Sequence, residues 1–547
     1  MDSPTVLTVV AAIAVQSIVS PIPEFPTELY IVPYIMSNLL FFSYLLARSM
    51  TYSAVLISLL STNATFLLTS ALLAIVRRLF FSPLRRFPGP KLAAISGFWN
   101  ANEARLGRAS RTYKALHKKY KSDVIRIGPN ELSINNADAI DKLYGGKYIR
   151  GTFNQVFNLA GGNNLASLRD HEKHSAWRRM WGKGFTRTEV SHYTERVQGH
   201  ADKTVRMLHE KAGNPVDCGK ILEALAFDVI MDLAFSRDAR LQEGHGDRRY
   251  IELINGFLQF ANVVGHLPHL QQIFRYLPLN DDGRLFINLS NLILSDRQAL
   301  KTPRKDIFTH LLASDHKTNF AMTQMDLQQQ IFLTLVVGTH SISTTLTQTF
   351  AALASRPDVQ ARIRQELNNA FDGTGVPPTE TVRHLKYVEA VVKEGLRMFP
   401  PLLGGTPAIA PKGGVALKTG DFIPENTQVW ISQHVLMSDD RYFPRAAEFL
   451  PERWMDQEGE NDGKGNELMK DRRAWIPFGY GTHACGGRAL ALEELKLLVV
   501  RFVREFDICF GQEGGQPFNL DEWADSWKDV YLTMIQKIDL RFIPRAG

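Results

Sequence analysis

Two long uncharged runs within the first 80 residues constrain this chain more than any other feature. Residues 29–47 are apolar apart from Ser, Asn and one Pro, and residues 52–76 are apolar with only Ser, Thr and Asn interruptions. Each run is close to the ~20 residues that a helix needs to cross a bilayer. A shorter run, residues 6–20, is either a further span or the apolar part of a signal-like segment. We therefore predict a membrane anchor over residues 1–80, with one to three transmembrane helices.

Positive charge follows the last apolar run directly, at Arg77, Arg78, Arg85, Arg86 and Lys91. Such flanking charge favours the cytosolic side of a membrane, so we expect the rest of the chain to face the cytosol from the endoplasmic reticulum membrane. Residues 87–90 read Phe-Pro-Gly-Pro, which stops a helix because proline fixes φ and lacks an amide donor. The sequence thus predicts a stiff Pro/Gly hinge at 81–91 before a globular part at 92–547.

The globular part reads as one large catalytic domain, because apolar periodic stretches follow one another with only short polar breaks. The chain carries 63 Lys and Arg against 56 Asp and Glu, with no basic stripe interleaved with aromatic residues, so nucleic acid is not an expected partner. Three cysteines occur, Cys218, Cys485 and Cys509. This odd and widely spaced set excludes a disulfide framework and indicates a reducing compartment. We expect a monomer.

One cysteine lies in a glycine-rich segment. Residues 477–488 read Pro-Phe-Gly-Tyr-Gly-Thr-His-Ala-Cys-Gly-Gly-Arg, and residues 489–506 have the periodicity of a strong helix. Glycines allow tight turns and a close approach of the backbone to a flat ligand. A cysteine before a helix also lies among unpaired amide donors, which lowers the pKa of its thiol. Cys485 is therefore predicted to be a metal ligand or a nucleophile.

The same segment resembles the haem-binding loop of the cytochrome P-450 superfamily, through Phe478, Gly481, His483, Cys485 and Gly487. The resemblance implies that the Cys485 thiolate binds the iron of haem b, where it favours cleavage of the O–O bond. It also implies a hydrogen bond from His483 to a haem propionate. The resemblance extends from about residue 87 to the C-terminus. It implies a mainly α fold with small β-sheets, and a haem buried between two long helices.

Two further motifs resemble the charged triad of this family. Glu394 and Arg397 lie three residues apart on a predicted helix, where they can pair, and Arg453 lies in the segment Phe-Leu-Pro-Glu-Arg-Trp. Alone, Glu-x-x-Arg is most simply a surface ion pair. The resemblance implies instead a buried structural triad under the haem loop, in which loss of one member leaves a buried charge without a partner.

The segment from His174 to Arg178 resembles the family's helix that binds the haem propionates. The resemblance implies that His174 and Arg178 are the propionate-binding residues. The alternative is a solvated basic helix face. The family often carries a further propionate-binding Arg where this chain has Ala408.

A long helix predicted over residues 326–355 is apolar nearly all round and should be buried, with a capping box at Thr323 and Asp326. It aligns with the oxygen-activating stretch of the family, but His340 replaces the usual acid and Ser341 the usual threonine. Histidine can shuttle protons and serine keeps a hydroxyl, so the two residues are candidates for a catalytic proton relay. A core histidine bonded to a backbone carbonyl is the other interpretation of His340.

The resemblance as a whole implies a haem-thiolate monooxygenase of a lipophilic small molecule, with electrons supplied by NADPH through a cytochrome P-450 reductase in the membrane. The Phe-Pro-Gly-Pro segment and His483 resemble fungal enzymes of secondary metabolism, among which terpenoids are frequent substrates. We therefore expect a terpenoid substrate, with polyketides, alkaloids and xenobiotics as alternatives. Two alternatives remain open at this point. One is a haem-thiolate isomerase or dehydratase that needs no reductase, and the other is a haem-binding protein without catalytic turnover.

Overall fold

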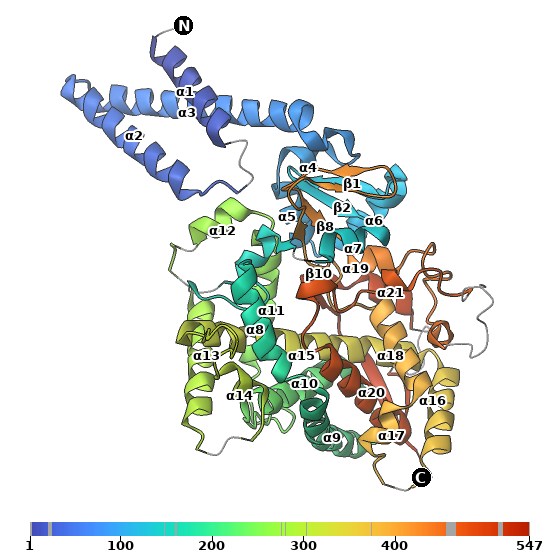
Figure 1. Ribbon diagram of the computed structural model, residues 1–547. Coiled ribbons are helices and arrows are strands. Elements are labelled where there is room, and N and C mark those ends of the chain that lie inside the picture. The colour runs from blue at the N-terminus through green and yellow to red at the C-terminus, as the bar shows by residue number, and fades with distance from the viewer. Residues whose placement is uncertain are drawn as a thin grey trace.

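The computed structural model describes residues 3–19, 24–146, 148–158, 161–274, 276–278, 280–301, 304–373, 375–455, 467–511 and 518–545. Three N-terminal helices project from one corner of a mainly helical body (Figure 1). The body has a β-rich part beside these helices and a larger helical part beyond it (Figure 1). Two of the projecting helices, Glu28–Ala47 and the segment Tyr52–Phe81, are long and apolar enough to cross a membrane.

The N-terminal helices are α1 (Ser3–Val19), α2 (Glu28–Ala47) and α3 (Tyr52–Val76). The next helices along the chain are α4 (Lys91–Ile95), α5 (Phe98–Arg105), α6 (Ala109–Tyr120), α7 (Asp138–Tyr144), α8 (His171–Lys183), α9 (Arg187–Glu210), α10 (Cys218–Phe235), α11 (Arg249–Val264), α12 (Pro268–Phe274), α13 (Asp281–Ala299) and α14 (Ile307–Leu311). The remaining helices are α15 (Gln324–Ala354), α16 (Pro357–Ala370), α17 (Thr379–Arg383), α18 (Lys386–Met398), α19 (Gln433–Met437), α20 (Arg488–Glu505) and α21 (Leu520–Asp525).

The strands form four small sheets. The largest has the order β1-β2-β8-β5-β3, from β1 (Val124–Gly128), β2 (Glu131–Ile134), β8 (Gln428–Trp430), β5 (Ala408–Ile409) and β3 (Ile149–Arg150). The others pair β4 (Val216–Asp217) and β9 (Phe506–Phe510) with β12 (Asp539–Pro544), β6 (Val415–Ala416) with β7 (Phe422–Ile423), and β10 (Lys528–Val530) with β11 (Leu532–Met534). The predicted mainly α fold with small sheets is confirmed.

Helix α15 runs through the middle of the body (Figure 1), as expected for a helix that is apolar nearly all round. Its predicted capping box is confirmed, because the Thr323 hydroxyl accepts from the Asp326 amide and the Asp326 carboxylate accepts from the Thr323 amide. Gly338 allows α15 to lie close to α10, since a Cβ there would come within 2.4 Å of Ile230. This packing against α10 places the middle of α15 opposite the Cys485 loop.

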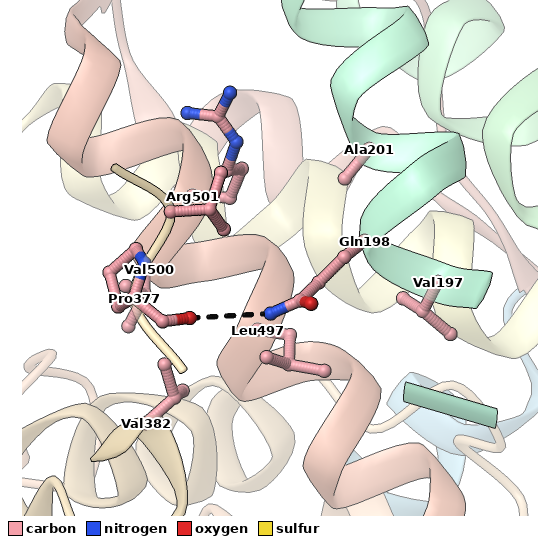
Figure 2. A pocket seen from close by; sticks show the side chains of 9 residues that line it. Val197, Gln198, Ala201, Pro377, Val382, Leu497, Val500 and Arg501 are labelled. Atoms are coloured by element: carbon pink, nitrogen blue, oxygen red, sulfur yellow. Dashed lines mark hydrogen bonds between the residues drawn. The ribbon is translucent and has the colours of Figure 1, made fainter. Parts of the chain in front are cut away.

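Helix α20 packs against α9, and Figure 2 shows this contact. Leu497 and Val500 of α20 face Val197 of α9 across a hollow of about 10 Å³, which holds roughly one water molecule. The Arg501 guanidinium donates to the Asp202 carboxylate of α9 at 2.9 Å. Close packing here fixes the helix that follows the cysteine loop.

The Pro/Gly segment does not hang freely between the N-terminal helices and the body. The Arg126 amide of β1 donates to the Pro88 carbonyl at 2.7 Å, and a Cβ at Gly89 would lie 2.1 Å from the Arg126 carbonyl oxygen. Phe87 is buried in the core around the large sheet. Residues 87–89 of the predicted Pro/Gly hinge thus pack against the body at β1, because glycine here allows close backbone contact.

Candidate active site

A cavity of about 240 Å³ lies between α15 on one side and the Cys485 loop with α20 on the other. Helices α8, α10 and α14 close its edges. Its walls are apolar over α10 and α15, whereas basic side chains lie at one end. The cavity thus offers a mostly apolar body with a polar edge, as expected for a cofactor site.

The loop that carries Cys485 is held in a fixed shape by its own backbone. The Cys485 amide donates to the Phe478 carbonyl at 2.7 Å, and Gly479 adopts a positive φ of 69°. Gly481 also has a positive φ, and a Cβ there would lie 1.9 Å from the Tyr144 carbonyl oxygen. Only glycine fits at this position. The loop therefore presents Cys485 to the cavity three residues before α20 begins.

The charge state of Cys485 depends on opposing effects. Its side chain is accessible from the cavity but surrounded by protein, and burial raises the pKa of the thiol. The amides of Gly487 and Arg488 and the guanidinium of Arg178 act in the opposite direction. The lowered pKa expected from the sequence is thus corrected, since burial outweighs the helix-end donors in the protein alone. A cation at the cavity side would complete the stabilisation of a thiolate.

Four basic side chains gather at one end of the cavity, namely Arg150, His174, Arg178 and His483. The Arg150 guanidinium donates from Nε to His483 Nδ1 at 3.0 Å, and His483 Nε2 lies 3.3 Å from the Tyr148 carbonyl oxygen. The His174 ring lies 4.0 Å from the His483 ring. Burial and the charge of Arg150 lower the pKa of His174 to about 4 and that of His483 to about 2, so both rings are neutral.

Arg150 and Arg178 have no acidic partner in the part of the chain that the structure describes. Among the described residues, no carboxylate lies within ion-pair distance of Arg150 or Arg178. Gly486 gives Arg178 room, because a Cβ there would lie 2.8 Å from the guanidinium. Burying charge without a partner is costly. This end of the cavity is therefore suited to bind an anion.

Arg150 also explains the absence of an arginine at Ala408. The two residues are directly opposite one another in the antiparallel pair of β3 and β5. Neighbouring strands lie about 5 Å apart, so an arginine on β3 reaches the same region as one on β5. The structure thus supplies a guanidinium from the adjacent strand.

Helix α15 faces the cavity with one stripe of side chains. The stripe consists of Leu333, Thr334, Val337, Gly338, Ser341 and Ile342. The Ser341 hydroxyl donates to the Val337 carbonyl at 2.6 Å, which leaves its oxygen able to accept a hydrogen bond from the cavity.

His340 does not line the cavity, since successive helix residues are about 100° apart and it falls beside this stripe. Its Nε2 lies 3.0 Å from the Thr533 carbonyl oxygen, and burial lowers the pKa of His340 to about 4. The structure thus brings Ser341 but not His340 to the cavity. A direct relay through both residues is corrected to the other interpretation, a neutral core histidine bonded to a carbonyl.

The acidic and basic residues predicted as a triad lie together and are completely buried. The Glu394 carboxylate accepts two hydrogen bonds from Arg397 at 2.9 Å and one from Arg453 at 3.0 Å. It also accepts from Trp454 Nε1 at 2.9 Å and from the Leu450 amide at 3.0 Å. Every lone pair of the carboxylate is thus engaged, so the cluster is complete without a ligand.

A row of aromatic rings connects this triad to the cysteine loop. The Trp454 ring lies 5.3 Å from the Trp475 ring, which in turn lies 6.2 Å from the Phe478 ring. The Arg488 guanidinium lies over Trp475 and Phe478 at 5.7 and 5.6 Å. Phe478 thus supports the Cys485 loop through its contacts with Trp475 and Arg488. The buried triad in turn stabilises Trp454, against which Trp475 packs.

Glu494 on α20 is a second acid next to the cavity, and its surroundings are different. It is 5% exposed and lines the cavity with Gly487, Leu490 and Ala491, and no described residue forms a hydrogen bond or ion pair with it. Burial raises the pKa of Glu494 to about 8, so the carboxyl is protonated at neutral pH. It contributes a hydrogen-bond donor to an otherwise apolar wall.

These features fit haem b. A mostly apolar cavity between two helices suits the flat macrocycle, and Arg150 and Arg178, which pair with no described carboxylate, suit its two carboxylates. Cys485 faces the same space from a glycine-rich loop, where its sulfur would bind the haem iron. With thiolate ligation, bound haem supplies activation of dioxygen.

Comparison with known proteins agrees with this site. The family described as Cytochrome P450 matches residues 88–534. The chain belongs to the cytochrome P450 family. It is therefore an oxidoreductase, a monooxygenase with haem b as its cofactor, and members of the family draw their electrons from NADPH through a reductase.

Several curated cytochromes P450 are similar over most of their length. "Cytochrome P450 67" from Uromyces fabae is 29% identical over 90% of this chain and 92% of that protein. "Cytochrome P450 monooxygenase nodW" from Hypoxylon pulicicidum is 29% identical over 86% of this chain and 85% of its own, and "Cytochrome P450 monooxygenase sthD" from Phaeosphaeria nodorum is 29% identical over 86% and 96%.

Solved structures show the same fold. A crystal structure of a cytochrome P450 superposes with a TM-score of 0.67 at 19% identity, over 82% of this chain and 96% of that chain. The haem domain of cytochrome P450DA superposes with a TM-score of 0.68 at 17% identity, over 82% and 95%. The predicted family and fold are thus confirmed.

Not every residue predicted for this P450 site reaches the cavity. Those that do are Cys485, His483, Gly487, His174, Arg178 and Ser341. Phe478 and Gly481 shape the loop from behind. Sequence reasoning missed Arg150, which only strand register brings to the site, and Glu494. An acid among apolar residues on the cavity face of α20 was the available signal for Glu494.

Proposed function

We propose that this P450 is a membrane-bound haem-thiolate monooxygenase that oxidises a lipophilic secondary metabolite. Cys485 is the iron ligand, held at the cavity by its glycine loop. The single observation that carries this proposal is the convergence on one cavity of Cys485, the guanidinium groups of Arg150 and Arg178, and Ser341 of α15. One oxygen atom enters the substrate and the other leaves as water.

The residues around the cavity would have separate roles in binding haem and in moving protons. Arg150, Arg178 and His174 hold the haem carboxylates, and His483 orients Arg150 through its Nδ1 atom. Ser341 of α15 lines the cavity, where it would pass protons by accepting at its oxygen and donating at its hydrogen. His340 would act indirectly, by fixing α15 to β11 through the Thr533 carbonyl.

The substrate is proposed to be a terpenoid. The cavity walls on α10 and α15 are apolar, and the N-terminal helices would hold the enzyme at the endoplasmic reticulum membrane, into which such molecules partition. The electrons would come from NADPH through a membrane-bound reductase. Exposed Arg472 and Arg488 flank the cysteine loop and suit an acidic partner. Turnover that does not change with ionic strength would argue against this docking face.

The decisive experiment is the visible spectrum of the reduced, carbon-monoxide-bound protein. The native enzyme is expected to give a thiolate-type Soret band, and Cys485→Ala is expected to lose it. Cys509→Ala is the matched control, since this half-buried cysteine lies away from the cavity and should leave the band unchanged. A thiolate-type band that survives in Cys485→Ala would disprove the assignment of the ligand.

The missing acid beside Ser341 favours one second candidate, a haem-thiolate isomerase or dehydratase that needs no external electrons. Product formation with isotopically labelled dioxygen separates the two activities. A monooxygenase incorporates label and requires NADPH with a reductase, whereas an isomerase forms product without either.

A further inference from the structure

The helices α2 and α3 have the dimensions and connection of a transmembrane pair. At 1.5 Å rise per residue the 20 residues of α2 span about 30 Å, close to the hydrocarbon thickness of a bilayer. Only residues 48–51 separate the two helices, and so short a link makes them antiparallel neighbours. Figure 1 shows both helices extending away from the body and joining at their far end.

Polar side chains tie the two helices together midway along their length. The Tyr34 hydroxyl of α2 donates to the Asn63 side-chain oxygen of α3, and the Asn63 amide donates to the Asn38 side-chain oxygen at 2.6 Å. Within hydrocarbon, such groups must find partners on a neighbouring helix. These bonds hold α2 and α3 as one unit, and they engage the asparagine of the Asn-Ala-Thr sequence at 63–65.

The segment that leads into α2 is attached to the catalytic domain. The Arg169 guanidinium donates two hydrogen bonds to the Glu24 carboxylate, at 2.6 and 2.8 Å. The Thr27 amide donates to the Gln272 side-chain oxygen on α12 at 2.6 Å. The start of α2 therefore lies on the same side as the catalytic domain.

The segment that follows α3 is attached to the same domain. The Arg78 guanidinium donates to the Ile95 carbonyl at 2.6 Å, and the Arg126 guanidinium donates to the Arg78 carbonyl at 2.9 Å. Both ends of the helix pair thus meet the catalytic domain, and the link at 48–51 lies at the far end. A single crossing would place the two ends on opposite sides of the membrane, which these contacts forbid.

We propose that α2 and α3 cross the membrane as a helical hairpin, with residues 48–51 on the face opposite the catalytic domain and residues 24–28 docked on that domain beside α12. This rests on the membrane attachment in the proposed function. Charge agrees with it, because the catalytic side of the hairpin carries Arg77, Arg78, Arg85 and Arg86, whereas the link carries Arg48 alone. The lipid bilayer is the partner, and the hairpin fixes which edge of the enzyme faces it.

Cysteine labelling in sealed microsomal vesicles tests the crossing. In a Cys509→Ser background of the full-length holoenzyme, Ser49→Cys and Pro26→Cys are compared with a membrane-impermeant maleimide. Pro26→Cys is expected to react at once, and Ser49→Cys only after detergent. Reaction of Ser49→Cys in sealed vesicles, or protection of Pro26→Cys, would each overturn the hairpin. Release of the protein by alkaline carbonate would instead show that the attachment itself fails, while the carbon monoxide spectrum reports the haem site separately.

A charge reversal tests the docking. Arg169→Glu is expected to speed proteolytic cleavage of residues 24–28 several-fold, and Arg169→Glu with Glu24→Arg is expected to restore the native rate. The exposed pair Arg445 and Glu448, reversed in the same way, is the control. An unchanged cleavage rate in Arg169→Glu would contradict the docking.

Discussion

Two groups of buried or half-buried arginines lie on either side of the Cys485 loop, and they differ in what neutralises them. Behind the loop, Arg397 and Arg453 share the carboxylate of Glu394. On the cavity side, Arg150 and Arg178 have no carboxylate partner among the described residues. Because buried charge is costly without a partner, the first group is complete as folded, whereas the second is completed by an anionic ligand. The comparison distinguishes a structural cluster from a binding cluster.

The two buried acids repeat this contrast. Glu394 accepts hydrogen bonds from Arg397, Arg453, Trp454 and a backbone amide, whereas Glu494 has no such partner among the described residues and is protonated. An acid with full charge pairing serves the fold. An acid that stays neutral beside the cavity costs stability at neutral pH, which is typical of a position retained for function.

The largest effect is expected for Arg453→Met. It leaves Glu394 with half of its charge partners in a fully buried site, which costs about 3–5 kcal/mol of folding free energy. We expect little folded holoenzyme, measured as haem content and urea unfolding. Arg445→Ala removes an exposed ion pair and should cost at most about 1 kcal/mol. Equal losses in the two variants would break the comparison.

Glu494→Gln is expected to stabilise the folded protein, whereas Arg453→Met destabilises it. Burial raises the pKa of Glu494 from 4.5 to about 8, so the folded protein keeps a proton that the unfolded chain loses, and stability falls as pH rises from 4.5 to 8. Removing the acid should therefore stabilise the protein at pH 7 by on the order of 3 kcal/mol. Urea unfolding at pH 5, 7 and 8.5 measures this. A gain that does not grow with pH would refute the protonated state.

Arg150→Ala tests the binding cluster. The fold should survive, because its partner His483 is neutral, while one charge-assisted bond to a haem carboxylate is lost. Such a bond contributes about 1.5–3 kcal/mol, so haem should dissociate about 10- to 100-fold faster. Transfer of haem to an excess of a haem-scavenging protein gives the rate. Arg108→Ala, an exposed arginine far from the cavity, is the control, and equal rates in the two variants would exclude Arg150 from haem binding.

The smallest effect concerns His174. Its pKa is lowered from 6.5 to about 4 by burial and by Arg150, so the stability that it contributes is present above pH 6.5 and is lost as pH falls toward 4. Of the stability that the haem-free protein loses between pH 7 and pH 5, His174 should contribute about 2 kcal/mol, and His174→Asn should reduce the loss by that amount. The exposed His192→Asn serves as control. Bound haem carboxylates should raise the pKa of His174 and flatten the dependence, so an unchanged slope after haem loading would place them elsewhere.

Local patterns in the sequence predicted much of this P450. The capping box of α15 and the spacing of Glu394 and Arg397 are set by neighbours in the chain, so each could be predicted from the sequence with the physical reason for it. The glycines around Cys485 were also visible in the sequence, although the contacts of Gly481 with Tyr144 and of Gly486 with Arg178 came only from the structure. The apolar runs likewise predicted helices with the length of a membrane span. These features depend on residues within a few turns of one another.

Tertiary structure alone decided the rest. Arg150 reaches the cavity because β3 pairs with β5, whose residues lie more than 250 positions away, and His340 turns from it because α15 packs on α10. The pKa of Glu494 and that of Cys485 follow from burial, which no local pattern states. The return of residues 24–28 to the catalytic domain likewise depends on distant partners such as Arg169. Pairing register, helix rotation and desolvation are properties of the packed molecule. They depend on partners that are distant in the sequence, so no local sequence pattern predicts them.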